Sequence, residues 1–155
     1  LKNTALMKSI FEKEAYNEII GRLEKLSPTA KAHWGKMNVA QMLAHCKKPI
    51  YLPLSDKKHP RMFMGILMGW MFKDQLYNDK PWKQGLPTAP DFIIKDERDF
   101  NKEKSELKEL IGKLHAAGPS GINQHPHPFF GKFTPAQWGQ SAYKHLDHHL
   151  KQFGA

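Results

Sequence analysis

The chain has 155 residues, 40% hydrophobic and 25% charged, a balance typical of one soluble globular domain over residues 1–155 rather than of a disordered segment. Its single cysteine, Cys46, excludes an internal disulfide framework and any cysteine-rich zinc module. With 24 Lys and Arg residues against 15 Asp and Glu residues, the net charge is +9, so charge alone permits nucleic acid or another anionic surface as a partner.

Neither a targeting segment nor a membrane span is indicated by the sequence pattern. Residues 1–15 carry Lys or Glu at short intervals, which is not typical of a signal peptide. The longest apolar run, residues 62–72, is shorter than the roughly 20 residues that a spanning helix needs. We therefore expect a cytoplasmic protein that has no membrane partner.

Two helices are predicted in the first third of the chain. Apolar residues recur at three- and four-residue steps over residues 10–26, and the serine–proline pair at 27–28 ends that helix, because a residue before proline resists helical dihedrals. Asn38 followed by Gln41 is a capping-box pattern for a second helix from residue 39. Pro49 is expected to kink or end this second helix.

The middle of the chain combines an apolar helix with a long irregular segment. Residues 61–76 are predicted to form a helix that is apolar on almost every side, and such a helix is more often buried in a core or a subunit contact than docked on a membrane. Gly65 and Gly69, four residues apart, allow another segment to approach closely. Prolines and glycines then interrupt residues 78–99, which predicts a loop that shapes access to a site. Residues 93–94 are the only run that resembles a strand.

Two further helices complete the predicted fold. The fourth begins near Phe100 and stops at the glycine–proline pair 118–119. The last begins after Thr134, a good N-cap, has Pro135 in its first position and runs to about Phe153. The expected fold class is all-α, a four-helix bundle with long irregular connections.

The nine histidines concentrate near the end of the chain. On a helical wheel, Trp138, Ala142 and Leu146 mark the core-facing stripe of the last helix, and His145 and His149 fall on that face. Histidines at positions i and i+4 lie one turn apart and can bind one metal ion together. The zinc-protease motif is absent, because Leu146 stands where its glutamate would follow the first histidine. The alternative is a pair of hydrogen-bonded core histidines.

Other polar residues are candidates for the same site. His45 in the second helix is the natural third ligand, although it lies on the flank of that helix's apolar stripe. Ser141 and Gln152 fall beside the histidine pair on the wheel, and with His127 they are the candidate catalytic residues. His127 is equally well explained as part of a rigid connection that packs aromatic residues, and His125 is better explained that way.

Four segments carry a resemblance to a known family: residues 34–37 (WGKM), 41–45 (QMLAH), 127–131 (HPFFG) and 143–154 (YKHLDHHLKQFG). With these segments in this order, the chain resembles the DinB/YfiT-like superfamily, and within it a bacterial branch of domains of unknown function. The resemblance implies a four-helix bundle in which three histidines hold a divalent metal ion. Carried over residue by residue, these ligands are His45, His145 and His149.

Three neutral imidazoles suit zinc, nickel, iron or manganese, and they leave an open coordination position that is typical of catalytic sites. Such a metal lowers the pKa of bound water or activates a thiol as thiolate. The leading hypothesis is therefore a metal-dependent hydrolase or thiol transferase that acts on an unidentified small molecule.

Two other hypotheses belong to different classes. The first is a metal-free, basic helical binding module whose histidines are structural and whose partner is nucleic acid or an acidic protein surface. Because the chain has only three arginines, and arginine dominates direct base readout, we do not expect it to bind nucleic acid by sequence. The second is assembly as a homodimer through the apolar segment 61–76.

Overall fold

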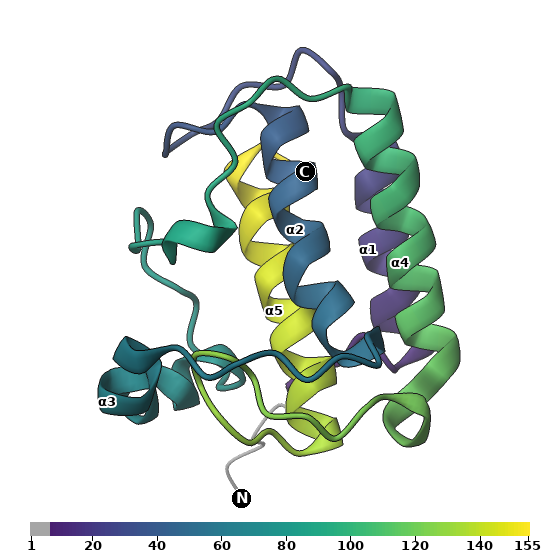
Figure 1. The fold of residues 1–155 in the computed structure, drawn as a ribbon. Coiled ribbons are helices and arrows are strands. Elements are labelled where there is room, and N and C mark those ends of the chain that lie inside the picture. The colour runs from purple at the N-terminus through teal and green to yellow at the C-terminus, as the bar shows by residue number, and fades with distance from the viewer. Residues whose placement is uncertain (1–6) are drawn as a thin grey trace, which may run out of the picture.

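The computed structural model describes residues 7–155 (Figure 1). Residues 1–6, which include part of the segment that argues against a signal peptide, lie outside the described residues. Every regular element in the described part is helical, so the predicted all-α class is confirmed and residues 93–94 form no strand there. The elements are α1 (Lys13–Lys25), α2 (Val39–Leu54), α3 (Phe63–Phe72), α4 (Phe100–Gly121) and α5 (Pro135–Gln152), with 3-10 turns η1 (Lys73–Leu76) and η2 (Pro90–Phe92).

Four of these helices, α1, α2, α4 and α5, pack side by side as a bundle (Figure 1). Each contributes an aliphatic stripe to one core, and burying one such side chain stabilises the fold by roughly 1.5–3 kcal/mol. The packing sets α2 directly against α5, which brings two histidine-bearing helices together. The fully buried aliphatic residues of these four helices include Ile19, Leu23, Leu43, Ile50, Leu107, Ile111, Leu114, Leu146 and Leu150.

The starts of α2 and α5 are fixed by capping boxes. The side chain of Asn38 accepts a hydrogen bond from the Gln41 amide at 2.8 Å, and the Gln41 side chain accepts one from the Asn38 amide at 3.0 Å. Thr134 and Gln137 form the same reciprocal pair at the start of α5. One such N-cap is worth about 1 kcal/mol, and the two together define where His45 and His145 fall along their helices.

Helix α2 does not end near Pro49 but continues through Pro53 to Leu54. A proline inside a helix removes one backbone hydrogen bond and costs about 3 kcal/mol. Beyond Pro49 the helix buries Ile50 and Leu52 in the core, and this burial offsets the lost hydrogen bond. In α4, by contrast, the predicted stop is real: Gly118 adopts a φ of 63° that interrupts the helix before one further turn.

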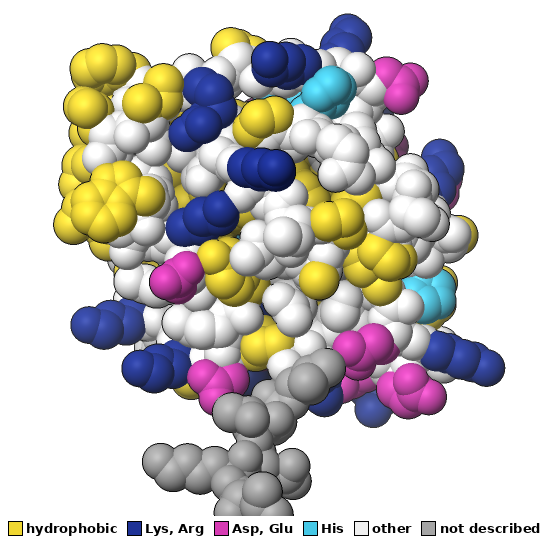
Figure 2. All heavy atoms as spheres, turned by 90° about the horizontal axis from the view of Figure 1, so that it is seen from below, with side chains coloured by type: hydrophobic (Ala, Val, Ile, Leu, Met, Phe, Trp, Pro, Cys, Tyr) yellow, Lys and Arg dark blue, Asp and Glu magenta, His cyan; other side chains and the backbone are white. Residues whose placement is uncertain are grey.

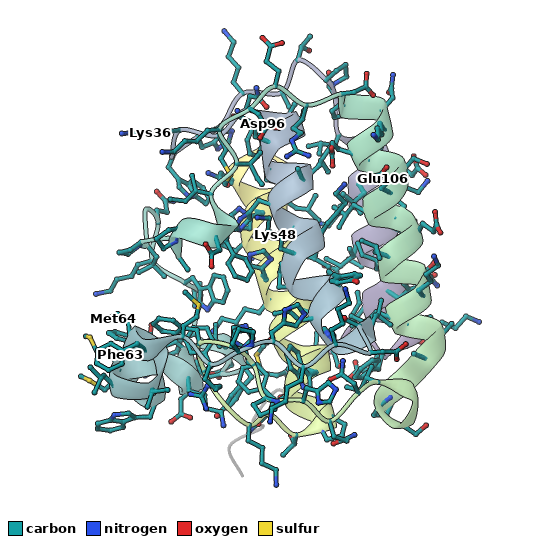
Figure 3. The ribbon with its side chains drawn as sticks, in the orientation of Figure 1. Lys36, Lys48, Phe63, Met64, Asp96 and Glu106 are labelled. Carbon is teal, nitrogen blue, oxygen red and sulfur yellow. The ribbon has the colours of Figure 1, made fainter. Side chains whose placement is uncertain are left out.

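Helix α3 stands outside the bundle, so the prediction that it belongs to the core is wrong, whereas its burial in a subunit contact stays a prediction (Figure 1). Only Gly65 and Gly69 are buried, because they pack on the backbone of Phe129. A Cβ atom at either position would overlap the carbonyl oxygen of Phe129. The large side chains point away from the bundle and gather at one corner of the molecule (Figures 2 and 3). None of the helices in residues 7–155 has the length and apolar character that crossing a membrane requires. The exposed side chains of α3 are Phe63, Met64, Ile66, Leu67, Met68, Trp70, Met71 and Phe72.

One glycine substitution tests the contact between α3 and Phe129, and a second, at a glycine with open space around it, is its control. We expect Gly65→Ala to lower the free energy of unfolding by about 1–3 kcal/mol, because the new methyl group forces α3 away from the Phe129 backbone. Gly21→Ala, in the interior of α1 with open space around it, should raise the free energy of unfolding by about 0.5–1 kcal/mol. Denaturant unfolding, together with the rate of proteolysis within residues 57–76, measures both effects. Equal stability and equal proteolysis for the two variants would contradict this packing.

Candidate metal centre

Three histidines from α2 and α5 converge on one point. His45, His145 and His149 each offer one ring nitrogen, and these three atoms lie within 4.8 Å of one another. The Nε2 atoms of His45 and His145 are 3.0 Å apart, and the ring of His149 has its centroid 4.7 Å from that of His45 and 4.6 Å from that of His145. A tetrahedral ion with ligands at 2.0–2.1 Å spaces them about 3.3 Å apart, so the separation between His45 and His145 is close to the spacing that one ion requires, and the third nitrogen lies within 4.8 Å of both.

Two of the three imidazoles are oriented by hydrogen bonds from their other nitrogen. His45 Nδ1 lies 2.8 Å from the carbonyl oxygen of Phe92. His149 Nδ1 lies 2.8 Å from Gln152 Oε1, and Gln152 Nε2 donates to the carbonyl oxygen of Trp34 at 2.7 Å. Because both oxygens can only accept, each Nδ1 must donate, and each Nε2 keeps its lone pair for the cluster. This is the pattern found around metal-binding histidines.

The third imidazole is not satisfied by the protein. His145 Nε2 faces His45, while His145 Nδ1 is buried and has no hydrogen-bond partner among the described residues. An unpartnered buried polar atom costs about 1–3 kcal/mol, and core histidines normally avoid that cost. An ion on His145 Nε2 would leave this Nδ1 atom as it is, so it is the convergence of three ring nitrogens, and not the unpartnered atom, that fits a divalent ion.

The environment keeps all three imidazoles neutral. Burial lowers the pKa of His45 and, together with the nearby histidines, holds the pKa of His145 well below its ordinary value. Burial and the proximity of His45 lower the pKa of His149 to about 3. Neutral imidazole is the form that binds metals, so these side chains need lose no proton to act as ligands near pH 7.

The irregular segment 78–99 contacts the histidine cluster, and its control of access to the site stays a prediction. Trp82 packs against His145 and His148, with ring centroids 5.7 and 5.4 Å away. Trp34 also packs against His148, at a centroid distance of 5.4 Å. His148 therefore contacts two indoles beside the metal-ligand candidates, although the helical wheel places it at the edge of α5.

A buried lysine ties this segment to α5. Lys144 precedes His145 and is only 7% exposed. Its ammonium group donates to the carbonyl oxygen of Gln75 at 2.5 Å, and to the carbonyl oxygen and side-chain oxygen of Asn78 at 3.0 and 2.7 Å. Burial lowers the pKa of Lys144 to about 8. These contacts hold the chain that leads to Trp82 and were not anticipated from the sequence, because a lysine on a helix is usually solvated.

The WGKM segment and the residue before it support the cluster through contacts with Gln152. The carbonyl oxygen of Trp34 accepts the hydrogen bond from Gln152, and the amide of His33 donates to the carbonyl oxygen of Gln152 at 2.8 Å. Gly35 has a φ of 83°, and a Cβ there would lie 2.7 Å from Gln152 Nε2. Glycine is required at this position both by its backbone conformation and by the close approach of Gln152.

The structure does not place His127 with the three converging histidines. Its ring is buried among aromatic side chains, and its Nδ1 accepts hydrogen bonds from the amides of Phe129 and Phe130 at 3.1 and 3.2 Å. Burial and the nearby Arg61 lower its pKa to about 3. These are the contacts of a residue that organises the connection between α4 and α5, and a catalytic role for His127 stays a prediction.

The remaining polar candidates differ in their surroundings. Ser141 lies on α5, is partly buried and makes no side-chain hydrogen bond within the described part of the chain. Gln152 is buried and orients His149, so it supports the cluster rather than facing open space. Cys46 is fully buried in the core, where burial raises the pKa of its thiol and leaves it inert.

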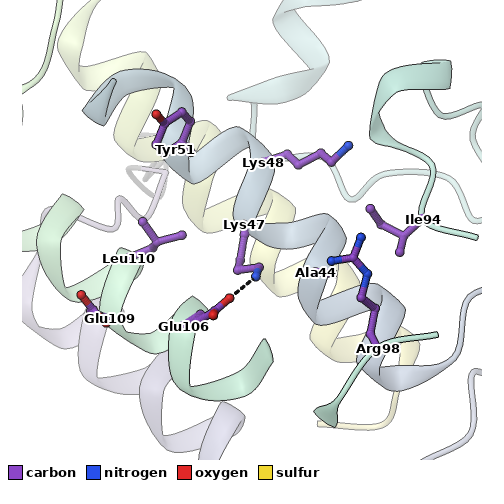
Figure 4. A pocket seen from close by; sticks show the side chains of 9 residues that line it. All are labelled: Ala44, Lys47, Lys48, Tyr51, Ile94, Arg98, Glu106, Glu109 and Leu110. Carbon is purple, nitrogen blue, oxygen red and sulfur yellow. Dashed lines mark hydrogen bonds and ion pairs between the residues drawn. The ribbon is translucent and has the colours of Figure 1, made fainter. Parts of the chain in front are cut away.

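A second hollow lies across α2 from the histidines, lined in part by Lys47, Arg98 and Glu106 (Figure 4). Two of its three positive side chains have carboxylate partners: Lys47 pairs with Glu103 and Glu106 at 2.5 Å, and Arg98 pairs with Asp96 and Glu103. The third, Lys48, donates to the carbonyl oxygen of Asp91. The histidine cluster, in which three ring nitrogens converge on one point, is the stronger candidate for a functional site.

The fold and the cluster together define a helical bundle with a buried three-histidine site. Residues 7–155 match the family described as "Protein of unknown function (DUF1569)", and the chain belongs to this family. No curated protein matches the chain, and no solved structure does. These comparisons do not reach the DinB/YfiT-like superfamily, and that likeness stays a prediction.

The buried histidines make the stability of the fold depend on pH. The unfolded chain protonates its histidines near pH 6.5, whereas folded His127 resists protonation until about pH 3. Its contribution to stability is therefore complete above pH 6.5 and is lost as the pH falls from 6.5 towards 3.

The variant His127→Asn isolates this effect, because an asparagine oxygen can accept the same two amide hydrogen bonds without titrating. We expect its unfolding free energy to fall less steeply between pH 6.5 and 4, by up to about 1.4 kcal/mol per pH unit. Denaturant unfolding at a series of pH values, with a chelator present throughout, measures the slope separately from the loss of ring packing. Parallel curves for the two proteins would contradict the assignment.

Proposed function

We propose that His45, His145 and His149 bind one divalent metal ion and that this ion is the centre of a metal-dependent enzyme, a hydrolase or thiol transferase acting on a small molecule. The observation that carries the proposal is the convergence of three neutral ring nitrogens within 4.8 Å, two of them oriented by acceptors on the far side of the ring. Three ligands leave a further coordination position, which is typical of catalytic sites.

The chemistry follows from the donor set. A zinc, nickel, iron or manganese ion held by three imidazoles supplies a Lewis acid that lowers the pKa of a bound water or thiol. The protein's own part is to keep the imidazoles unprotonated, which burial does, and to fix their orientation, which Phe92 and Gln152 do.

The walls of the site indicate a substrate with apolar or aromatic surface. Trp34 and Trp82 flank His148 next to the cluster, and indole rings bind flat or apolar groups while they exclude water. The resemblance to the DinB/YfiT-like superfamily, whose histidine pattern coincides with this cluster, also supports the proposal. The metal-free binding module is less well supported, because it gives no reason for three buried imidazoles to bring their ring nitrogens within 4.8 Å of one another.

Metal content is the direct test. The protein without an affinity tag, loaded with zinc or nickel and then dialysed, should retain about one equivalent by elemental mass spectrometry, because three histidines form one site. The double variant His145→Ala, His149→Ala should retain none.

The matched control is His33→Ala, His125→Ala, which removes two histidines outside the cluster and should retain the metal. Absence of metal from the loaded parent protein, or equal retention by all three proteins, would overturn the proposal.

Gln152 provides a graded test of the same site. Gln152→Ala removes the acceptor from His149 Nδ1, and loss of such an outer hydrogen bond typically weakens metal binding about 10- to 100-fold. Competition with a chromogenic chelator measures the affinity. Gln140→Ala, on the same helix and outside the cluster, is the control and should bind as the parent does. An unchanged affinity in Gln152→Ala would show that His149 does not need this hydrogen bond to bind the ion.

A further inference from the structure

Helix α3 exposes an apolar surface that the bundle does not use. Phe63 and Trp70 are 72% and 73% exposed, and six more large apolar side chains of the helix are more than a third exposed. Scattered apolar residues are normal on a protein surface, but a continuous patch of this kind marks an interaction site. Figure 2 shows these side chains gathered at one corner of the molecule.

The exposed large apolar side chains of Phe63–Phe72 form an apolar belt, and the way α3 is attached explains why this belt is exposed. The helix contacts the bundle through Gly65 and Gly69, which rest on the backbone of Phe129. The amide of Met62 donates to the carbonyl oxygen of Pro128 at 2.9 Å and fixes the start of the helix. Because the two glycines occupy only a narrow face of the helix, nearly all of its large side chains point away from the contact with Phe129.

This belt offers a partner no free polar group. Among the side chains of Phe63–Phe72, the indole N–H of Trp70 is the only strong donor, and it already donates to the carbonyl oxygen of Leu67 at 3.2 Å. Protein interfaces usually carry about one hydrogen bond per 100–200 Å². Lipid acyl chains require none, and they favour a segment whose backbone is satisfied within a helix.

The charged side chains in and beside the segment that carries the belt are mostly basic. Within residues 57–76, and at Lys132 beside them, five side chains are basic and only Asp74 is acidic. Within the described residues none of these five pairs with a carboxylate. Figure 2 shows basic side chains alongside the apolar corner. A second copy of the chain would bring a like-charged rim against this one, whereas an anionic surface complements it. The basic residues are Lys57, Lys58, Arg61, Lys73 and Lys132.

We propose that α3 is a membrane-docking helix that inserts its apolar belt into the interfacial region of an anionic lipid bilayer, with the basic rim on the lipid headgroups. A ten-residue helix is about 15 Å long and cannot span the roughly 30 Å hydrocarbon core. Lying in the membrane plane, it matches the 5–10 Å depth of interfacial helices. The expectation of no membrane partner rested on the absence of a spanning helix, and this mode of binding needs none.

Vesicle flotation tests the proposal with the full chain. We expect the protein to float with vesicles of phosphatidylcholine and phosphatidylglycerol, to float weakly with phosphatidylcholine alone, and to bind less as the salt concentration rises. Phe63→Ser, Trp70→Ser should lower the partition coefficient roughly tenfold or more. The matched control, Tyr51→Ser, Leu86→Ser, changes two exposed apolar residues outside α3 and should bind as the parent does.

Charge is tested by a second matched pair. Lys73→Glu, Lys132→Glu should weaken binding several-fold, because Lys73 follows the last residue of α3, Lys132 lies beside it, and each basic residue near the surface contributes to the attraction. Lys31→Glu, Lys36→Glu makes the same change in net charge at exposed lysines away from α3, with Lys36 at the opposite end of the bundle from Phe63 and Met64 (Figure 3), and should weaken binding much less. Circular dichroism verifies that each variant is folded.

Insertion has a spectroscopic signature as well. Tryptophan emission should shift to the blue on binding anionic vesicles, and Trp70→Phe should bind but lose most of that shift. Failure to bind anionic vesicles, or equal binding by Phe63→Ser, Trp70→Ser and its control, would overturn the proposal. Sedimentation as a dimer that Phe63→Ser, Trp70→Ser dissociates would also overturn it, because a second copy would then cover the belt.

Discussion

The contact between α2 and α5 is the constraint on which the rest of the site depends. It sets His45 Nε2 3.0 Å from His145 Nε2, and it does so through the buried aliphatic residues around them rather than through the histidines themselves. A shift of α2 by one residue would turn its side chains by about 100° and bring Cys46 in place of His45 towards α5. The capping boxes at Asn38 and Thr134 hold both helices against such a shift, so local signals in the chain determine a contact between residues 100 positions apart.

Much of this arrangement could be predicted from the sequence, because it depends on periodicity and on helix ends. The inward direction of His145 and His149 follows from the helical repeat of α5, and the caps at Asn38 and Thr134 are visible in the residue types. His45 was harder, since the repeat places it on a flank that becomes interior only when α2 meets both α4 and α5. The apolar composition of α3 predicted a place in the core, and this was wrong. The helix contacts the rest of the protein through a narrow face made of Gly65 and Gly69, so its large side chains stay outside.

The residues that complete the site could not be predicted, because their contacts are made by segments distant in sequence. The carbonyl oxygen of Phe92 lies 47 residues from His45 and carries no sequence information about that role. Lys144 looks like a solvated helix residue until the chain around Asn78 folds over it and supplies three oxygen acceptors. Such partners are determined by how the irregular segment 78–99 and the turn before it pack on the bundle, and local propensity does not encode that packing.

The histidine cluster and the exposed helix are joined by a short, anchored stretch of chain. Helix α3 runs directly into η1, and Gln75 at the end of η1 accepts a hydrogen bond from Lys144, the neighbour of His145. The chain then reaches Trp82, which covers His145 and His148. This stretch is therefore held at both ends, by the packing of α3 on the Phe129 backbone and by the hydrogen bonds of Lys144. The apolar helix and the polar cluster thus belong to one continuous structural unit, although they serve different chemistry.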